Sequence, residues 1–326
     1  MRAIRVSEPG GPEKLVLAEE PDPVPNAGEL LVEVHATALN RADLLQRRGL
    51  YPPPPGASPI LGLECAGIVR DAGPGAPRER IGERVMALLA GGGYAELCAI
   101  PERLAMPVPA SLSFEEAAAI PEAFLTAAEA LFQRGALAPG ELALVHAAGG
   151  GVGSAAVELA LASGARVVAT TGSEEKRVRL LELGAQTTVD YKTEDFVEVV
   201  REVSAGRGAD VILDFVGAQY AERHAECLAE GGRQVVLGLL GGSSATVDYG
   251  KLLRKRQSLL GLVMRSRPVS EKAELTQRFV RRWLPLFDDG RLRPIVDSVF
   301  PLERATLAHE RMEANLNFGK IVLKVR

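Results

Sequence analysis

The middle of the chain alternates strictly between short apolar runs and helical segments, and this alternation constrains the fold more than any other feature. We expect strands at 142–146, 166–170, 187–189, 211–214 and 233–237, separated by helices at 153–162, 174–183, 195–203 and 220–228. Strands this uniformly apolar are buried on both faces, and alternation of this kind indicates a parallel sheet covered by helices on both sides. The expected fold class is therefore α/β with a doubly wound parallel sheet.

The segments on either side have a different character. From Met1 to about Leu112 the apolar runs are short, alternating and interrupted by Pro and Gly, which predicts a β-rich, barrel-like region. Its expected elements are strands at 30–36, 64–69, 83–88 and 94–100 and one helix at 41–47. A helical segment at 115–132 follows. After Lys251 we expect strands at 259–264, 295–300 and 320–325 and helices at 269–287 and 303–312, with the last strand returning to the first region.

Length and charge exclude several classes of protein. At about 150 residues per domain, 326 residues suggest two domains. The formal net charge of −4 gives no general attraction to nucleic acid, and no uncharged apolar run reaches the ~18 residues of a membrane-spanning helix. Met1 to Arg5 lead into acidic, Pro and Gly residues rather than a signal-peptide core. We therefore expect a cytoplasmic protein with no nucleic-acid or membrane partner.

Reactive side chains are few and scattered. The three cysteines are far apart, the four histidines do not form His-Glu-x-x-His, and neither Gly-x-Ser-x-Gly nor Gly-Lys-Ser/Thr occurs. Metalloprotease, esterase and P-loop chemistry are therefore poorly supported. Spacing alone leaves open a zinc site assembled from distant residues.

The strongest local signal runs from Val145 to Ser154, where an expected strand leads into an expected helix. As a dinucleotide-binding fingerprint it places Gly150 against the pyrophosphate and Gly153 at the packing of the helix on the strand, with Ala148 at the first glycine position. Free N–H groups and the helix dipole would bind phosphate there. The expected cofactor contacts are Ala148, Gly149, Gly150, Gly151, Val152 and Gly153. The alternative is a merely flexible turn.

The end of the second strand distinguishes between the two nicotinamide cofactors. NAD-binding units usually have an acid there for the ribose 2′-hydroxyl, whereas this chain has Gly172 and Ser173. Lys176 and Arg177 follow one helical turn later, where a 2′-phosphate would lie against cations. Two intervening glutamates argue against this, although acids also suit the first turn of a helix, and the cations are otherwise solvated surface charges. We expect NADPH.

Over essentially its whole length the chain resembles the zinc-independent quinone oxidoreductases (zeta-crystallin-like) of the medium-chain dehydrogenase/reductase superfamily. The segments that carry the resemblance are 39–43, 51–56, 61–69, 81–85, 91–96, 145–154 and 313–322. The Pro-rich stretch at 51–56 and the segment 313–322 are more similar to the tumour-suppressor-inducible quinone oxidoreductases than to zeta-crystallin. The resemblance implies a GroES-like β-barrel catalytic domain at 1–118 and 266–326 and a Rossmann NADPH-binding domain at 119–265, with the substrate cleft between them. It also implies a homodimer, or a tetramer, joined through edge strands near Ser258 to Val263.

The resemblance also allows the positions of the zinc ligands to be compared one by one. Zinc alcohol dehydrogenases of the superfamily have a Cys where this chain has Asn40, a His where it has Leu63, and a Cys near Glu122. Asn is a poor zinc ligand and Leu is none. The four-cysteine structural lobe expected after 91–93 is also missing. No metal is therefore expected, and the acceptor must be one that is reduced without a Lewis acid, as a quinone is.

Three residues are candidates for supporting the developing oxyanion by hydrogen bonds: Asn40, Asp43 and Tyr51. Each has a simpler interpretation. Asn40 is also a suitable N-cap of the helix at 41–47. Asp43 suits the first turn of that helix or pairs with a neighbouring arginine. Tyr51 precedes four prolines, which stiffen the backbone and either hold its ring beside the nicotinamide or form a rigid surface loop.

Further cofactor contacts are implied by the resemblance alone. They are Tyr51, Tyr191, Val216, Gly217, Gly238, Leu239, Met264, Arg265 and Asn317. The resulting hypothesis is an NADPH-dependent, metal-independent quinone reductase that transfers hydride or single electrons to a small-molecule quinone. The alternatives are an NADPH-dependent reductase of the C=C bond of enals, enones or enoyl thioesters, and a weakly catalytic NADPH-binding sensor or RNA-binding protein.

Overall fold

The computed structural model describes all 326 residues. They divide into two compact units, which we call the barrel unit (Met1–Leu125 and Met264–Arg326) and the Rossmann unit (Thr126–Val263). The first boundary lies after residue 125 rather than 118, because α2 (Phe114–Ala118) packs on strands of the barrel unit and α3 (Pro121–Ala128) crosses the boundary. The second lies after residue 263 rather than 265.

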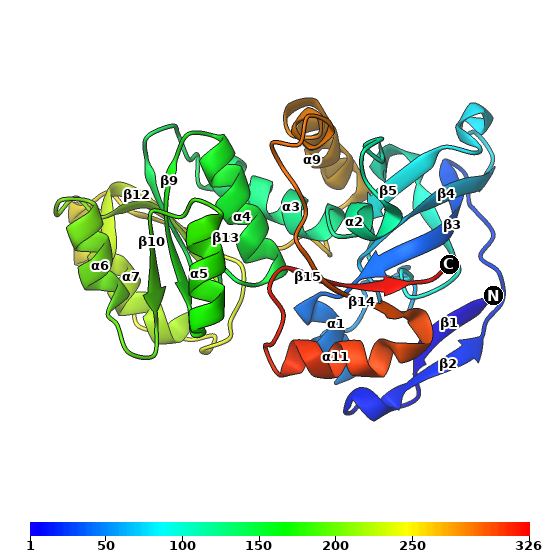
Figure 1. Ribbon diagram of the computed structural model, residues 1–326, viewed down its shortest axis with the longest axis horizontal. Helices are drawn as coiled ribbons and strands as arrows, with labels where there is room; N and C mark the ends of the chain where they lie inside the picture. Colours follow the sequence, from blue (N-terminus) through cyan, green and yellow to red (C-terminus); the bar gives the residue numbers. More distant parts are fainter. The chain divides into compact units, whose positions relative to one another are not determined.

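The barrel unit is built on a seven-stranded sheet (Figure 1). The strands follow the order β14 (Val296–Pro301), β15 (Lys320–Lys324), β3 (Glu29–Ala38), β4 (Glu64–Ala72), β5 (Arg84–Leu88) and β7 (Ala105–Pro107), with β6 (Leu97–Pro101) also paired to β3. Burial alternates along the first part of β3, as the alternating sequence predicts. The late strand β15 pairs antiparallel with β3, which confirms its predicted return. A separate ribbon of β1 (Arg2–Val6) and β2 (Leu15–Glu19) was not predicted.

The helices of the barrel unit are interrupted where the sequence has proline. In addition to α2, they are α1 (Arg41–Arg47), α9 (Val269–Arg282), α10 (Pro285–Asp288) and α11 (Ala305–Glu313). The single helix expected at 115–132 is wrong: α2 ends before Pro121, α3 begins there, and a π-helical turn η4 (Glu129–Arg134) follows. The helix expected at 269–287 likewise breaks before Pro285. Proline has no N–H for the helical ladder and disfavours helical backbone at the preceding residue, which accounts for both breaks.

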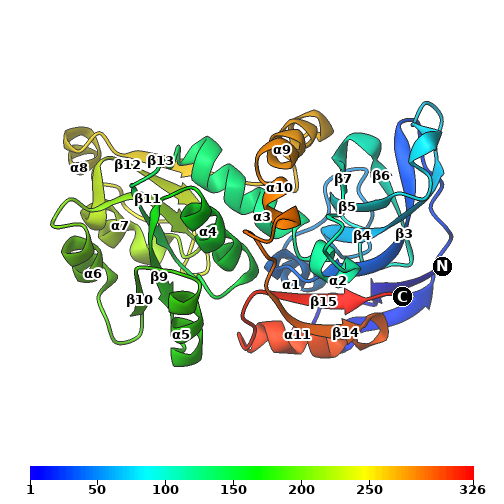
Figure 2. The same cartoon turned by 45° about the horizontal axis from the view of Figure 1, so that its top comes forward.

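The Rossmann unit contains the predicted all-parallel sheet. Its strands follow the order β10 (Thr187–Asp190), β9 (Arg166–Thr171), β8 (Leu142–Val145), β11 (Ala209–Asp214), β12 (Leu228–Val236) and β13 (Ser258–Gly261). Its helices are α4 (Gly151–Ala162), α5 (Glu174–Glu182), α6 (Phe196–Val203), α7 (Ala221–Cys227) and α8 (Tyr249–Arg254). Figures 1 and 2 show α4 and α5 on one face of the sheet and α6 and α7 on the other. The order reverses between β8 and β11, where ligands bind in sheets of this kind.

Two details of this region were missed. Helix α8 was not predicted, and β13 ends at Gly261 rather than at 264. No helix anywhere in the structure combines the length and the apolarity that crossing a bilayer would require.

Candidate functional site

The Gly-rich turn joins β8 to α4 at the carboxyl end of the central strands. Ala147 has a positive φ of 47°, the N–H of Ala148 donates to Thr170 O at 3.0 Å, and Gly150 is the N-cap of α4. The helix starts two residues earlier than predicted, so Gly151, Val152 and Gly153 form its first turn. The N–H groups of a first turn have no partner inside the helix, and they carry its positive dipole end.

Gly150 and Gly153 are both glycine, but for different structural reasons. A Cβ at Gly153 would overlap the carbonyl oxygen of Ala147 and lie 2.7 Å from Ala148 Cα, so only glycine lets α4 begin this close to β8. A Cβ at Gly150 would meet only the Ala147 carbonyl oxygen, at 3.3 Å. The space beside Gly150 is therefore open to a ligand, as the fingerprint requires. These features fit the pyrophosphate of a dinucleotide.

Aromatic and cationic side chains surround the end of β9. A Cβ on Gly172 would lie 2.7 Å from the Tyr191 hydroxyl oxygen, and Lys192 Nζ donates to Gly172 O at 2.5 Å. The side chain of Lys176 lies over the Gly-rich turn, since a Cβ on Gly149 would meet Lys176 Cδ at 2.8 Å. Tyr191 and Lys192 thus lie beside Gly172, next to Ser173, whereas Lys176 lies beside Gly149 of the Gly-rich turn. This group of two cations and a ring fits a phosphorylated ribose.

Arg177 is placed differently from Lys176. Its guanidinium lies 3.2 Å from Glu174 and 3.5 Å from Glu194, and its Nε donates to Thr188 Oγ1 at 3.4 Å. These partners hold the Arg177 side chain between α5 and β10. Lys192, which was not a candidate from the sequence, lies beside Gly172 instead.

The loops after β11 and β12 are the other predicted cofactor contacts. Asp214 Oδ1 accepts the N–H groups of Val216 and Gly217, each at 2.8 Å. Gly217 has a φ of 80° and Leu239 is exposed, while a Cβ on Gly238 would meet Phe215 O at 3.0 Å. The Asp214 carboxylate therefore shapes the turn that follows β11.

A chain of buried polar side chains runs behind these strand ends. His146 Nδ1 lies 2.9 Å from Thr170 Oγ1, and His146 Nε2 lies 2.9 Å from His224 Nε2. His224 Nδ1 accepts from Gln234 Nε2 at 3.0 Å, and Gln234 also donates to Asp214 at 2.9 Å. The chain ties β9, β8, α7, β12 and β11 together, and His146, which is fully buried, has a structural role in it.

In the barrel unit, Tyr51 and Arg265 lie together although the sequence separates them widely. The Arg265 guanidinium lies 5.1 Å from the Tyr51 ring centroid and donates to Tyr51 O at 3.3 Å. It also donates to Ala90 O at 2.8 Å and to Gln46 Oε1 at 2.6 Å. Arg265 is therefore a fixed cation behind a half-buried tyrosine, a cation–π arrangement. Met264, beside it in sequence, is buried.

Asn40 is part of a buried charged network. Its Nδ2 donates to Glu64 Oε1 at 2.9 Å and to Ala38 O at 3.3 Å, and its Oδ1 accepts from Lys320 Nζ at 2.7 Å. Lys320 also contacts Glu64 Oε1 at 2.7 Å. Both ends of the Asn40 amide are thus engaged within the protein.

Asp43 is fully buried beneath this network. Its Oδ2 accepts from the N–H of Asn40 at 2.7 Å and from the Tyr94 hydroxyl at 3.3 Å, and its Oδ1 accepts from the N–H of Gly62 at 3.2 Å. Burial raises the pKa of Asp43 to about 6, against the hydrogen bonds from the two N–H groups. No arginine pairs with Asp43, contrary to one of the interpretations above; Arg47 instead pairs with Glu313.

Glu122 lies beside the buried network of Asn40, Glu64 and Lys320. Its N–H donates to Glu64 Oε2 at 2.7 Å at the start of α3, and its side chain is partly exposed. Burial and the neighbouring Glu64 carboxylate raise the pKa of Glu122 to about 8, against the cations Lys320 and Lys272. Glu122 also acts electrostatically on Tyr51 and Arg265, which places it in their surroundings. A carboxyl group of this kind is protonated at neutral pH and can donate a proton.

Asn317 is the remaining candidate in the barrel unit. Its side chain is buried and its Nδ2 donates to Gly319 O at 2.8 Å, so it stabilises the turn before β15.

Three positions decide whether the chain offers ligands for a zinc ion. Asn40, Leu63 and Glu122 stand where zinc enzymes of the resembling superfamily have ligands, and the Asn40 amide is engaged by Lys320 and Glu64. No three His, Cys, Asp or Glu side chains of the chain lie close enough to share a metal ion. The residues present therefore do not fit a tetrahedral zinc ion.

Sequence reasoning missed Glu64, Lys320, Lys192 and the proton-bearing state of Glu122. A signal was present for the first two, since each charge stands directly before a run of small or apolar residues. A buried charge requires a partner, so two such positions predict a pair. Nothing in the sequence indicated which charges would pair.

Two protein families match the chain. The alcohol dehydrogenase GroES-like domain matches residues 26–110, and the zinc-binding dehydrogenase family matches residues 151–281. The quinone oxidoreductase of Rattus norvegicus is 33% identical over 99% of this chain and 97% of its own length. The synaptic vesicle membrane protein VAT-1 homolog of Homo sapiens is 32% identical over 99% of this chain and 86% of its own.

Solved structures of similar proteins superpose on the whole chain. The Escherichia coli quinone oxidoreductase complexed with NADPH superposes with a TM-score of 0.90 at 32% identity, covering 100% of both chains. A mycobacterial protein complexed with NADPH gives a TM-score of 0.90 at 30% identity, again over 100% of both chains.

Proposed function

Because the chain belongs to the medium-chain dehydrogenase/reductase superfamily and has quinone oxidoreductases among its relatives, we propose that it reduces quinones with NADPH and without a metal ion. The observation that carries the proposal is the end of β9, where Tyr191 and Lys192 lie beside Gly172 and no acid stands in the position that binds an unphosphorylated ribose, together with Lys176 over the Gly-rich turn. The absence of a zinc-type donor set favours an acceptor that needs no Lewis acid.

The cofactor contacts follow from the geometry of the Rossmann unit. The first turn of α4 and the space beside Gly150 would hold the pyrophosphate. Lys176 and Lys192 would pair with the 2′-phosphate, and the Tyr191 ring would lie against the ribose or adenine. The loops at 216–217 and 238–239 would line the remaining cofactor. Bound NADPH supplies the hydride equivalent.

The barrel unit supplies the groups that act on the acceptor. The Arg265 cation behind the Tyr51 ring favours a negative charge near the Tyr51 hydroxyl, and that hydroxyl can donate to the oxygen of the reduced quinone. Glu122 holds a proton at neutral pH and transfers it to the second oxygen. One hydride and one proton added to a quinone give the hydroquinone, and the Glu122 carboxylate then regains its proton from solvent.

Asn40 and Asp43 are assigned a supporting role in this proposal. The Asn40 amide bonds to Glu64 and Lys320, and the Asp43 carboxylate accepts from Asn40 and Gly62. The bonds of the Asn40 amide hold the start of α1 against β4 and β15, while Asp43 caps α1 and binds the segment before β4. The two residues would therefore position the site rather than contact the quinone.

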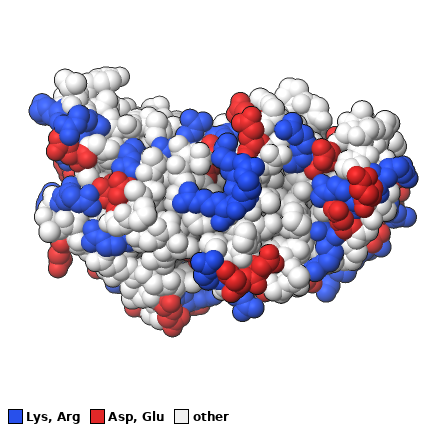
Figure 3. All heavy atoms as spheres, turned by 90° about the horizontal axis from the view of Figure 1, so that it is seen from above, with Lys and Arg blue, Asp and Glu red and all other residues white.

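A second candidate reaction uses the same groups. A proton held at Glu122 can equally be delivered to the carbon beside the carbonyl group after hydride addition to an enal, enone or enoyl thioester. A binding protein with little catalysis is the third candidate. Both basic and acidic side chains lie on the face shown in Figure 3, and the formal net charge of −4 disfavours RNA.

We further propose a homodimer joined through β13. This strand is the edge of the Rossmann sheet; its residue Leu259 is 52% exposed, and Val263, two residues beyond its end, is 49% exposed. An exposed apolar edge strand pairs readily with a second copy.

All three cysteines are free and buried, in keeping with the cytoplasm as the expected compartment.

Steady-state turnover with NADPH and a panel of acceptors tests the proposed reaction. We expect 1,2-naphthoquinone to be reduced with a much higher kcat/KM than crotonyl thioester or a simple enone. Preferred turnover of the C=C acceptors would assign the second reaction. Tight NADPH binding by calorimetry with no turnover of any acceptor would assign the third function.

A further inference from the structure

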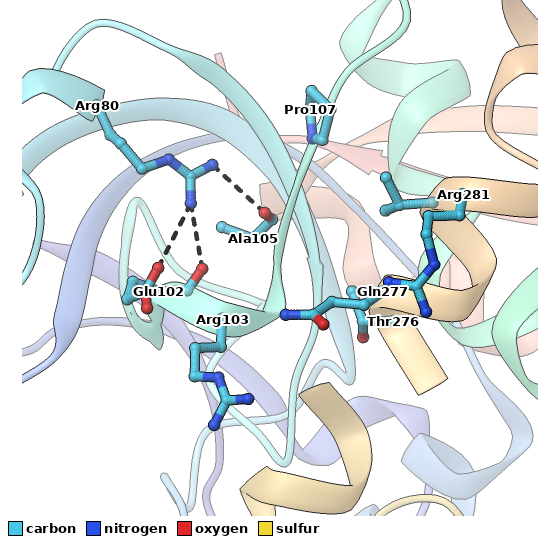
Figure 4. A pocket seen from close by; sticks show the side chains of 9 residues that line it. Arg80, Glu102, Arg103, Ala105, Pro107, Thr276, Gln277 and Arg281 are labelled. Carbon is cyan, nitrogen blue, oxygen red and sulfur yellow. Dashed lines mark hydrogen bonds and ion pairs between the residues drawn. The ribbon is translucent and has the colours of Figure 1, made fainter. Parts of the chain in front are cut away.

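A pocket of about 340 Å³ lies inside the barrel unit, between α9 and the segment 102–107 (Figure 4). Its lining residues are Arg80, Glu102, Arg103, Ala105, Pro107, Thr276, Gln277, Val280 and Arg281. None of them belongs to the candidate sites described above. The pocket therefore calls for its own explanation.

The charge of this pocket is positive. Arg80 is fixed in the wall, because it pairs with Glu83 at 2.7 Å and donates to the carbonyl oxygens of Glu102 and Ala105 at 3.1 and 3.3 Å. The Glu102 carboxylate lies 4.0 Å from its Nη1, so Arg80 is shared between Glu83 and Glu102. Arg103 and Arg281 are exposed, and neither guanidinium has an ion pair or hydrogen bond. They leave two unpaired cations at a pocket whose lining has three arginines and one glutamate.

Neutral donors accompany these cations. Thr276 is 2% exposed, and its hydroxyl oxygen is buried without a hydrogen-bond partner. In Figure 4 the Gln277 amide extends from α9 toward Arg103, while the Arg281 guanidinium lies on the α9 side. A buried hydroxyl without a partner is costly, and a ligand that accepts its hydrogen bond removes that cost.

The rest of the lining is apolar and belongs to Ala105, Pro107 and Val280. Two guanidinium groups, an amide and a hydroxyl offer hydrogen bonds from several directions. A tetrahedral phosphate, which has several acceptor oxygens, matches this set better than a planar carboxylate. The apolar wall suits an organic group attached to the phosphate.

From this arrangement we infer that the pocket is a second ligand site, which binds a small organic phosphate monoester between Arg103 and Arg281. The site is independent of the proposed reaction, because it shares no residue with the groups assigned to cofactor or acceptor.

Calorimetric titration with phenyl phosphate tests the inference. The titration is made at low salt and with NADPH at saturation, so that a phosphate site in the Rossmann unit is occupied. Benzoate and phenol are titrated in parallel, as the carboxylate and the neutral counterpart. The variants are Arg103→Ala, Arg281→Ala and Thr276→Val, the last of which keeps the shape of the side chain. Arg70→Ala, an arginine of the same unit with 58% side-chain exposure outside the pocket, is the matched control.

We expect saturable binding of phenyl phosphate that weakens about tenfold in each pocket arginine variant, the typical effect of one lost charge-assisted hydrogen bond. Thr276→Val weakens it less, and Arg70→Ala leaves it unchanged. Benzoate binds more weakly, and phenol does not bind. Equal affinity in wild type and all pocket variants, binding of phenol as strong as that of phenyl phosphate, or no saturable binding in the millimolar range would each overturn the inference.

Discussion

His146 and His224 face each other through their Nε2 atoms at 2.9 Å in the interior of the Rossmann unit. Because Gln234 Nε2 donates to His224 Nδ1, the proton of His224 must lie on Nε2, and it is donated to His146 Nε2. The His146 proton then lies on Nδ1 and is donated to Thr170. Both rings are thus neutral, each in one tautomer. A proton added to either ring would break a hydrogen bond.

The first prediction concerns acid. Burial lowers the pKa of His224 to about 4 and that of His146 well below its usual value. The ordinary pKa of histidine is ~6.5. Between that pH and about 4, these two histidines bind protons in the unfolded chain but not in the folded chain. Folding stability therefore falls as the pH falls through this range. NMR titration of the histidine ring signals should show both rings neutral at pH 5. Titration of either with an ordinary midpoint would contradict the tautomer assignment.

The second prediction concerns the cofactor phosphate. Lys176→Ala should raise KM for NADPH by about tenfold, because one charge-assisted hydrogen bond is lost, and should hardly change KM for NADH. Arg177→Ala is the matched control, since Arg177 is engaged by Glu174 and Glu194 and should matter much less. Equal effects of Lys176→Ala on both cofactors would remove Lys176 from the phosphate site.

The third prediction concerns the tyrosine hydroxyl. Tyr51→Phe should lower kcat about tenfold with little change in KM for NADPH, because a hydrogen bond to the developing oxyanion is lost while the ring stays beside Arg265. Tyr249→Phe, a tyrosine with 77% exposure, should have no effect. Wild-type kinetics in Tyr51→Phe would limit Tyr51 to a role in shape.

The fourth prediction concerns the proton donor. With a pKa of about 8, Glu122 carries its proton at pH 7 and loses it as pH rises, so kcat should fall through pH 8 in the wild type. Glu122→Gln should lower kcat at pH 7 by at least about tenfold and abolish that alkaline limb. Glu115→Gln, at a carboxylate paired with Lys324, serves as the control. An unchanged pH profile in Glu122→Gln would rule out the proposed role.

The fifth prediction concerns metal. Incubation with a chelator should leave turnover unchanged, because Asn40 and Leu63 offer no thiolate or imidazole for zinc. Elemental analysis should find well below one zinc per chain after purification. Stoichiometric zinc whose removal abolishes activity would contradict this.

Local patterns predicted the Rossmann unit more completely than the barrel unit. Its strands are continuous apolar runs between helices, and each is formed by residues close in sequence. In contrast, β1, β2 and the partners of β15 depend on pairing between distant segments, which periodicity does not reveal. The helix breaks at Pro121 and Pro285 could have been predicted from proline alone.

The residues of the candidate site also differ in whether the sequence could predict them. The Gly-rich turn and Lys176 lie in one local segment and could be selected from the sequence. Lys192 and the pair formed by Glu64 and Lys320 owe their places to strands that meet only in the folded protein. The engagement of Arg177 by two acids and the proton on Glu122 depend on such neighbours as well.

The pairing of β15 with β3 also orders events during synthesis. More than 250 residues separate the two strands, and the whole Rossmann unit lies between them. That unit has all of its own strands as soon as Val263 has been made, whereas residues 36–38 of β3 must wait for β15, which is translated much later. The early strands of the barrel unit thus have an unpaired edge while the inserted unit folds, and that interval is when this chain is most exposed to misassociation.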